Sequence, residues 1–157
     1  SEWGSQELVG IITGEEMWEN IGKQIGLSPA ERSECEKGYW AGIWDIGFLD
    51  YCHTLKSRYK LGIVSDAESN ARDIVKAWVN EALFDVIVFS SEAGVCKPNP
   101  HIFHDALERL GVDASATVFI DDREDNVNGA KAIGIHAIHY KNRDQVLVDL
   151  NEYISGK

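Results

Sequence analysis

Short apolar runs alternate with stretches of helical period in the second part of the chain, and this alternation limits the possible folds more than any other feature. The four runs are LGIVS (61–65), VIVFS (86–90), ATVFID (116–121) and IHAIHY (135–140). A stretch of roughly ten to fifteen residues with helical spacing of its apolar positions follows each run. Short β-branched strands separated by helices are typical of βαβ units, which build a parallel sheet. We therefore predict an α/β core, a parallel sheet flanked by helices, over residues 60–157.

The preceding part of the chain, residues 14–59, shows helical periodicity and contains no strand-like run. Ser28, Pro29 and Glu31 have the spacing of a helix N-cap, a first-turn proline and the third residue of a capping box. We therefore predict a small helical subdomain at 14–59, which follows a short connecting segment at 1–13.

The chain is acidic. It has 157 residues and a formal net charge of −11, from 15 Lys+Arg and 26 Asp+Glu. Such a surface repels nucleic acid and anionic membranes, so we expect neither as a partner. No run approaches the ~20 apolar residues that a membrane span needs. Three widely spaced cysteines are typical of free thiols in a reducing compartment, and we expect a cytoplasmic protein.

Polar residues stand at or just beyond the ends of three predicted strands. Ser65 and Asp66 end the first run, Lys97 follows the second, and Asp121 and Asp122 end the third. Ligands bind at the carboxyl ends of parallel strands, so we expect these side chains at one rim of the sheet. Carboxylates suit Mg²⁺, an ammonium group suits an anion and a hydroxyl suits a phosphate oxygen. The combination indicates a phosphate site.

Each of these residues also has a structural interpretation. Ser65 is a plausible N-cap for the helix that follows it, and Lys97 is a plausible solvated loop lysine. Capping of the next helix explains one of Asp121 and Asp122 more easily than both, because adjacent carboxylates repel unless a cation or hydrogen bonds compensate. The combination therefore favours a functional site more strongly than any single member does.

Three segments resemble the second, third and fourth motifs of the haloacid dehalogenase-like (HAD) hydrolase superfamily, in the order in which that superfamily has them. They are YKLGIVSDAESNAR (59–72), GVCKPNPHIFHDALERLGV (94–112) and ATVFIDDREDNVNGAKAIGIHAI (116–138). The helical subdomain is similar to the small helical cap of the phosphatase branch of that superfamily. The resemblance implies a Rossmann-like core with a cap, and a hydrolase similar to sugar-phosphate phosphatases and to the phosphatase domain of epoxide hydrolases.

The resemblance also implies how the rim binds a substrate. Ser65 would donate a hydrogen bond to a phosphate oxygen, helped by the backbone amide of Asp66. Lys97 would be the catalytic lysine that neutralises the phosphate and keeps the nucleophilic carboxylate ionised. The implied substrate is a small phosphorylated metabolite, and the cap would cover the rim and select among such phosphomonoesters.

A magnesium site follows from the same resemblance. Asp122 would be a direct ligand of Mg²⁺. Asp121 and Asn126 would support the ion, directly or through water. Asn126 would stand on the first turn of the helix that follows the acidic pair, facing back toward the site.

Two features depart from the pattern of the superfamily. Asp66 stands where the superfamily usually has Asn, and a carboxylate beside a phosphate is repulsive unless it points away. The first motif, of the type DxDxT, supplies the nucleophilic Asp, whereas the segment SEWGSQELVGIIT (1–13) contains no Asp. The resemblance therefore implies a truncated chain that lacks its covalent nucleophile and is inactive as it stands.

The missing motif would also supply the central strand of the sheet, between the strands that end at Ser65 and Asp121. Unpaired edges are unfavourable in a buried sheet, so we expect something to fill the gap. The candidates are an N-terminal segment of roughly 15–20 residues, the chain's own residues 6–13, or a strand from a second copy in a strand-swapped homodimer. Two functions remain open: a Mg²⁺-dependent phosphatase seen without its first motif, or a non-catalytic module that binds phosphate, Mg²⁺ or a partner strand.

Overall fold

The computed structural model describes residues 13–41, 45–67, 71–78 and 81–155. The chain divides into two compact units, Ser1–Cys96 and Lys97–Lys157. The predicted connecting segment and the candidate strand at 6–13 lie, apart from Thr13, outside the described residues. The boundaries of the cap at 14–59 and of the core at 60–157 stay predictions.

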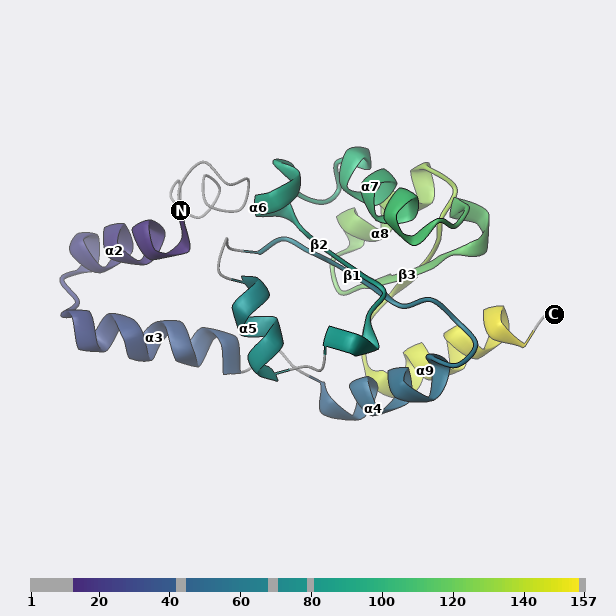
Figure 1. Cartoon of the computed structure of the whole chain (residues 1–157), viewed down its shortest axis with the longest axis horizontal. Helices are drawn as coiled ribbons and strands as arrows, with labels where there is room; N and C mark the ends of the chain where they lie inside the picture. Colours follow the sequence, from purple (N-terminus) through teal and green to yellow (C-terminus); the bar gives the residue numbers. More distant parts are fainter. Residues whose placement is uncertain (1–12, 42–44, 68–70, 79–80, 156–157) are drawn as a thin grey trace. The chain divides into compact units, whose positions relative to one another are not determined.

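The first unit contains a helical part followed by one parallel pair of strands (Figure 1). Its elements are α2 (Gly14–Ile25), α3 (Pro29–Ala41), α4 (Ile46–Leu55), β1 (Gly62–Ser65), α5 (Ala71–Trp78), the 3-10 turn η1 (Glu81–Leu83), β2 (Val86–Phe89) and α6 (Ser90–Ala93). In the parallel ladder, Gly62 lies opposite Val86 and Ser65 lies opposite Phe89. Because α5 and η1 connect the two strands, this is a βαβ unit, as the sequence predicts.

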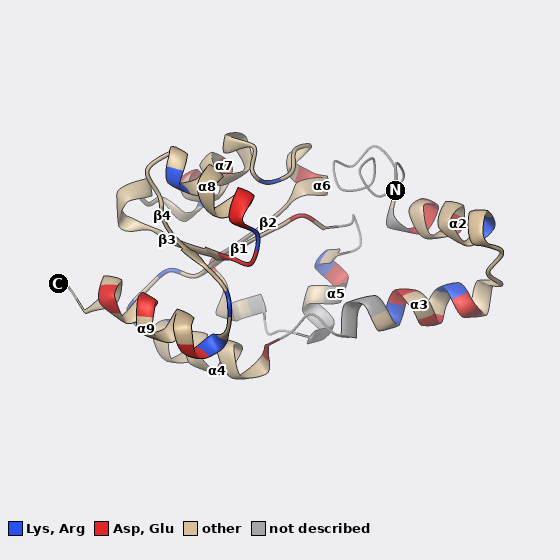
Figure 2. Ribbon diagram, turned by 180° about the vertical axis from the view of Figure 1, so that it is seen from behind, with Lys and Arg blue, Asp and Glu red and all other residues tan. Residues whose placement is uncertain are grey.

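Local chemistry fixes the ends of the first helices. The backbone N–H of Ser28 donates to Glu31 Oε2 at 2.9 Å, and the Ser28 hydroxyl donates to the same oxygen at 2.6 Å. This is the predicted capping box before α3. α2 ends at Gly26, whose φ of 78° is the left-handed conformation that glycine adopts without strain. Figure 2 shows acidic and basic residues interspersed along these two helices.

An apolar cluster joins α4, α5 and the two strands of the first unit. Its buried members are Ala67, Ala71, Val75, Ile87 and Phe89. Leu49 of α4 packs against the cluster. Burial of apolar surface of this kind stabilises the fold by about 25 cal/mol per Å². The cluster therefore ties α4 to the βαβ unit.

The second unit contains the other parallel pair of strands. Its elements are α7 (Pro100–Leu110), the 3-10 turn η2 (Ala114–Ala116), β3 (Val118–Asp121), α8 (Glu124–Ala132), β4 (His136–His139) and α9 (Arg143–Ile154). β3 pairs with β4 so that Asp121 lies opposite His139. Figure 1 shows α7 and α8 on one side of β3 and α9 on the other. The buried Phe103 ring of α7 meets the Phe119 ring of β3 edge-on, with centroids 5.2 Å apart.

The predicted α/β class with parallel strands flanked by helices is confirmed, since all four apolar runs form strands. Within the described ranges the strands make two sheets of two strands each, β1–β2 and β3–β4. No helix among the described residues has both the length and the apolar character of a membrane span.

Candidate functional site

A buried ion pair stands at the carboxyl end of β3. Lys97 Nζ lies 2.8 Å from Asp121 Oδ2, and the two side chains are only 10% and 6% exposed. The other carboxylate oxygen of Asp121 accepts hydrogen bonds from the backbone N–H of Arg123 and from Asn126 Nδ2, both at 2.9 Å. Both oxygens of Asp121 therefore have partners within the protein.

The surroundings of Asp121 determine its ionisation. Burial alone would raise the pKa of Asp121. The hydrogen bond and the positive charge of Lys97 act in the opposite direction, as do the two N–H donors on Oδ1, and together they hold the pKa below its usual value. Asp121 is therefore a fixed carboxylate whose charge is balanced by Lys97.

Asn126, on the first turn of α8, has one hydrogen-bonding atom without a partner. The residue is 1% exposed. Its Nδ2 donates to Asp121, whereas no hydrogen-bond donor among the described residues reaches its buried Oδ1. A buried acceptor without a donor is unfavourable and rare in folded proteins. This oxygen is therefore an available ligand atom beside the acidic pair.

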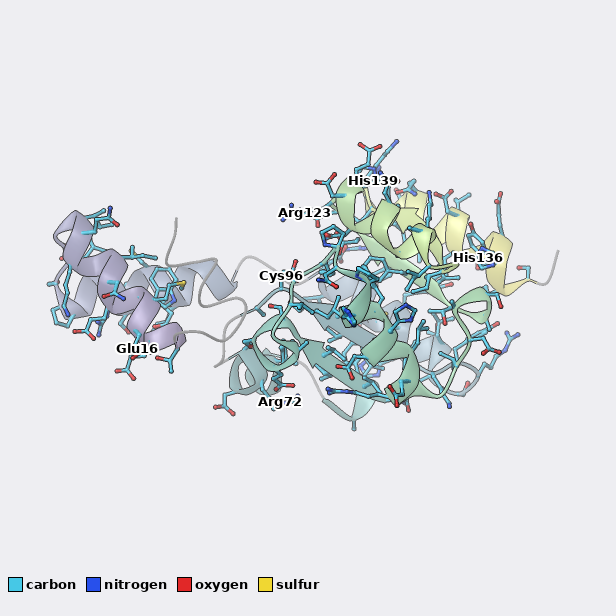
Figure 3. All side chains as sticks on the ribbon, turned by 90° about the horizontal axis from the view of Figure 1, so that it is seen from above. Glu16, Arg72, Cys96, Arg123, His136 and His139 are labelled. Atoms are coloured by element: carbon cyan, nitrogen blue, oxygen red, sulfur yellow. The ribbon has the colours of Figure 1, made fainter. Side chains whose placement is uncertain are left out.

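Asp122 differs in its exposure from its neighbour Asp121, which is the last residue of β3. It is exposed, whereas Asp121 is buried. Its backbone carbonyl oxygen lies 2.9 Å from His139 Nε2. A carbonyl oxygen only accepts, so the Nε2–H of His139 is the donor. Figure 3 labels Arg123, His139 and His136, of which His136 and His139 are the two ends of β4.

The carboxylate oxygens of Asp122 and the amide oxygen of Asn126 are suitable ligands for Mg²⁺. Among the described residues there is no cluster of three or more His, Cys, Asp or Glu residues that would form a complete protein cage for a metal. Mg²⁺ does not need one, since it usually keeps several waters and binds one or two carboxylates together with substrate phosphates. The Asp122 carboxylate and Asn126 Oδ1 fit that requirement, and Asp121 lies next to them, held by Lys97 and its N–H donors.

The loop after β1 contains the other predicted site residues. Ser65 ends β1, and Ser65 and Asp66 are both partly buried. The next residue, Ala67, donates its backbone N–H to Ser90 Oγ at 3.0 Å. Ser90 is fully buried and is the first residue of α6, directly after β2. Its hydroxyl therefore anchors the backbone that carries the predicted phosphate ligands.

The sequence interpretation missed Ser90. Its position at the end of an apolar run is a signal that the sequence offers, but its partner is 23 residues away.

The predicted residues fall into two groups, each within one unit. Lys97, Asp121 and Asn126 form a connected network with Asp122 next to it, and Ser65 and Asp66 share the loop after β1. Their roles toward a ligand stay predictions.

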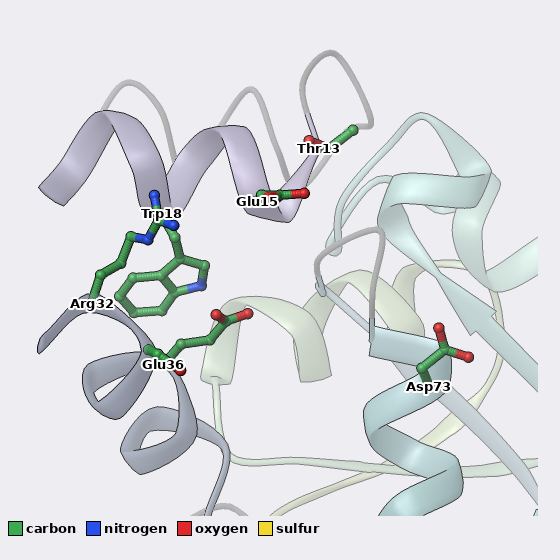
Figure 4. A pocket seen from close by; sticks show the side chains of 7 residues that line it. Thr13, Glu15, Trp18, Arg32, Glu36 and Asp73 are labelled. Atoms are coloured by element: carbon green, nitrogen blue, oxygen red, sulfur yellow. The ribbon is translucent and has the colours of Figure 1, made fainter. Parts of the chain in front are cut away.

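An open pocket of about 580 Å³ lies elsewhere in the first unit. Figure 4 shows Trp18 and Arg32 side by side, Glu36 on α3 and Asp73 on α5. Acidic and basic groups are mixed there, and the lining contains none of the predicted site residues. The pocket therefore does not identify the reactive centre.

Comparisons with known proteins agree on one family. A family model described as haloacid dehalogenase-like hydrolase matches residues 45–134. Haloacid dehalogenase-like hydrolase domain-containing protein 3 of Danio rerio is 40% identical over 83 residues, which are 50% of this chain and 34% of the relative. Glyceraldehyde 3-phosphate phosphatase of Pyrococcus abyssi is 32% identical over 90 residues, which are 53% of this chain and 36% of the relative.

A solved structure shows the same fold. A HAD family enzyme of Bacteroides thetaiotaomicron, solved as a complex with magnesium and inorganic phosphate, is 25% identical, with a TM-score of 0.74 over 87% of this chain and 74% of that chain. This chain spans about a third or less of the length of the first curated relatives that it matches. The family model covers more than half of the chain. The chain therefore belongs to the haloacid dehalogenase-like hydrolases.

Proposed function

We propose that this chain forms the phosphate- and Mg²⁺-binding part of a phosphatase that acts on small phosphomonoesters. The observation that carries the proposal is the buried network of Lys97, Asp121 and Asn126 with the exposed Asp122 beside it. The buried Lys97 ammonium group can bind an anion, and the exposed Asp122 carboxylate next to it can bind a cation. Such positioning and charge neutralisation are the main requirements of phosphoryl transfer.

The residues of the second unit have distinct roles in this proposal. Lys97 neutralises an incoming phosphate, and Asp121 keeps the ammonium group in place. Asp122 and Asn126 Oδ1 hold Mg²⁺. The bound ion supplies neutralisation of charge on the phosphoryl oxygens. Asp121 accepts hydrogen bonds from both Lys97 and Asn126, and it supports the site through these two residues.

In the first unit, the Ser65 hydroxyl and the Asp66 amide bind phosphate oxygens. The bond from Ala67 N–H to Ser90 Oγ fixes the backbone next to Asp66, which lowers the entropy that binding has to remove. Two similar proteins support a phosphate ligand: one relative is a glyceraldehyde 3-phosphate phosphatase, and one solved structure contains magnesium and inorganic phosphate.

Hydrolysis needs a nucleophile, and residues 1–13 contain no Asp. We therefore propose that this chain alone binds Mg²⁺ and phosphate without turning over a phosphomonoester. The test is an assay with p-nitrophenyl phosphate and Mg²⁺. The expected result is no turnover. Clear turnover that Lys97→Ala abolishes would overturn the non-catalytic part of the proposal.

Binding is tested by calorimetric titration with inorganic phosphate in the presence of Mg²⁺. Lys97→Met and Asp122→Asn are expected to weaken binding at least tenfold, since each removes a charge that contacts a ligand. Lys131→Met and Asp125→Asn are matched controls, because both side chains are exposed on the same helix α8. If all four variants bind like the original chain, or if that chain binds neither ligand, the proposed function is wrong.

A further inference from the structure

Gly129, in the middle of α8, lies against Pro98, the residue that follows Lys97. A Cβ atom built on Gly129 would lie 2.6 Å from Pro98 Cβ, 2.9 Å from Pro98 O and 3.3 Å from Pro98 Cα. Distances below 3.0 Å require the neighbouring atoms to move, and two of the three contacts are with the backbone of Pro98. Residue 129 therefore has room for a hydrogen atom and for nothing larger.

The same helix holds the acidic partner of Lys97. Asn126, one turn before Gly129, donates to Asp121 Oδ1 at 2.9 Å, while Lys97 Nζ lies 2.8 Å from Asp121 Oδ2. The Lys97 ammonium group also lies 5.7 Å from the centre of the Phe119 ring. α8 thus contacts the ion pair at both ends, through Asn126 on the acid and through Gly129 on the peptide next to the base.

We propose that Gly129 is a positioning residue for Lys97: the missing side chain lets α8 pack directly on Pro98 and so holds the Lys97 ammonium group on Asp121. The functional meaning of this role rests on the proposed phosphate site. The glycine is otherwise unfavourable in this place, because glycine in a helix interior is less stable than alanine. The close approach to Pro98 compensates for that disadvantage.

Gly38 of α3 provides a matched control. It is also a helical glycine, but a Cβ atom built on it would meet nothing within 4 Å. Gly129→Ala therefore adds a methyl group against the backbone of Pro98, whereas Gly38→Ala adds the same group where nothing lies within 4 Å. Any effect of helix propensity is common to both variants.

The test is the rate at which acetic anhydride acetylates Lys97 in the folded chain, followed by peptide mapping. Exposed Lys37, with 70% of its side chain accessible, serves as the internal reference. In Gly129→Ala, overpacking is expected to release Lys97 from Asp121 and to raise its relative rate about tenfold. In Gly38→Ala the rate is expected to stay unchanged. A folded Gly129→Ala chain in which Lys97 reacts as slowly as before would overturn the proposal.

A second variant covers the case in which Gly129→Ala does not fold. Pro98→Gly combined with Gly129→Ala removes the closest of the three contacts and leaves the 2.9 Å contact with the backbone oxygen, so folding and slow acetylation of Lys97 are expected to recover together in part. A double variant that is as unfolded as the single one would contradict the role of Pro98. Acetylation needs no ligand, so it tests the role of Gly129 even if the chain binds no phosphate in the titration. A negative titration counts against the proposed function and leaves the role of Gly129 unaffected.

Discussion

Two adjacent serines offer a sharp test of how the loop after β1 is held. Ser90 Oγ accepts the Ala67 N–H at 3.0 Å, and both residues are buried, with 0% and 3% of their surface exposed. The Oγ atom of Ser91 is also buried, but it has no hydrogen-bond partner among the described residues. Substitution of either serine by alanine therefore removes a buried hydroxyl group from the same short segment. Ser90→Ala removes one that is hydrogen-bonded to Ala67, and Ser91→Ala removes one that has no partner among the described residues.

The expected energies of unfolding differ for a definite reason. Ser90→Ala leaves the buried N–H of Ala67 without an acceptor, which costs about 1–3 kcal/mol in the free energy of unfolding. Ser91→Ala breaks no hydrogen bond in the described part of the chain, so its effect is expected to stay within about 0.5 kcal/mol. The ratio of unfolded to folded chains should thus rise roughly 5- to 150-fold in the first variant and little in the second.

Urea unfolding followed by circular dichroism measures both variants, and equal m-values show that the unfolded states are comparable. Hydrogen exchange at the Ala67 amide gives an independent local readout, which should accelerate only in Ser90→Ala. Equal destabilisation by the two variants, or an unchanged Ala67 amide in Ser90→Ala, would refute the claim that this hydroxyl anchors the loop.

Three further expectations concern other polar contacts. Lys97→Met should lower the free energy of unfolding by about 3 kcal/mol, because Asp121 loses the partner of a buried ion pair; a loss below about 1 kcal/mol in urea unfolding would contradict it. The hydrogen bond from Lys56 holds the pKa of Asp85 below its usual value, so this carboxylate stabilises the fold at neutral pH and stops doing so as the pH falls through that lowered pKa. The difference in the free energy of unfolding between the original chain and Asp85→Asn should therefore become smaller below about pH 4. A difference that grows on acidification would contradict this. Ser28→Ala should destabilise α3 by about 1 kcal/mol, measured as faster hydrogen exchange in its first turn; unchanged exchange would show that the capping box does not stabilise the helix.

Local patterns were sufficient to predict most of the secondary structure. The four apolar runs form strands because β-branched residues pack well on a pleated surface. α2 and α7 end at Gly26 and Gly111, with φ of 78° and 61°, as expected for left-handed C-caps. The four-residue helix α6 was missed because four residues carry no periodicity. Its support is tertiary: Glu92 receives three hydrogen bonds from Arg72, 20 residues earlier.

The sequence predicted part of the candidate site, as it did for the secondary structure. The positions of Lys97, Asp121 and Asn126 follow from strand ends and a helix start, and the structure brings these three together. Ser90 and Gly129 were missed because each matters only through a residue distant in sequence, Ala67 for one and Pro98 for the other. Composition and periodicity describe a residue's own environment along the chain, whereas a close approach between segments exists only after folding.

The way each pair of strands is connected has a consequence for how the chain folds. Gly62 pairs with Val86 across α5 and η1, and Val118 pairs with His136 across α8. A parallel pair needs a crossover of a dozen or more residues, and the two connections meet that requirement with residues 66–85 and 122–135. The entropy lost on closing such loops is small and grows only with the logarithm of their length. Because each strand pair lies within one unit, each sheet can complete its hydrogen bonds without waiting for the other.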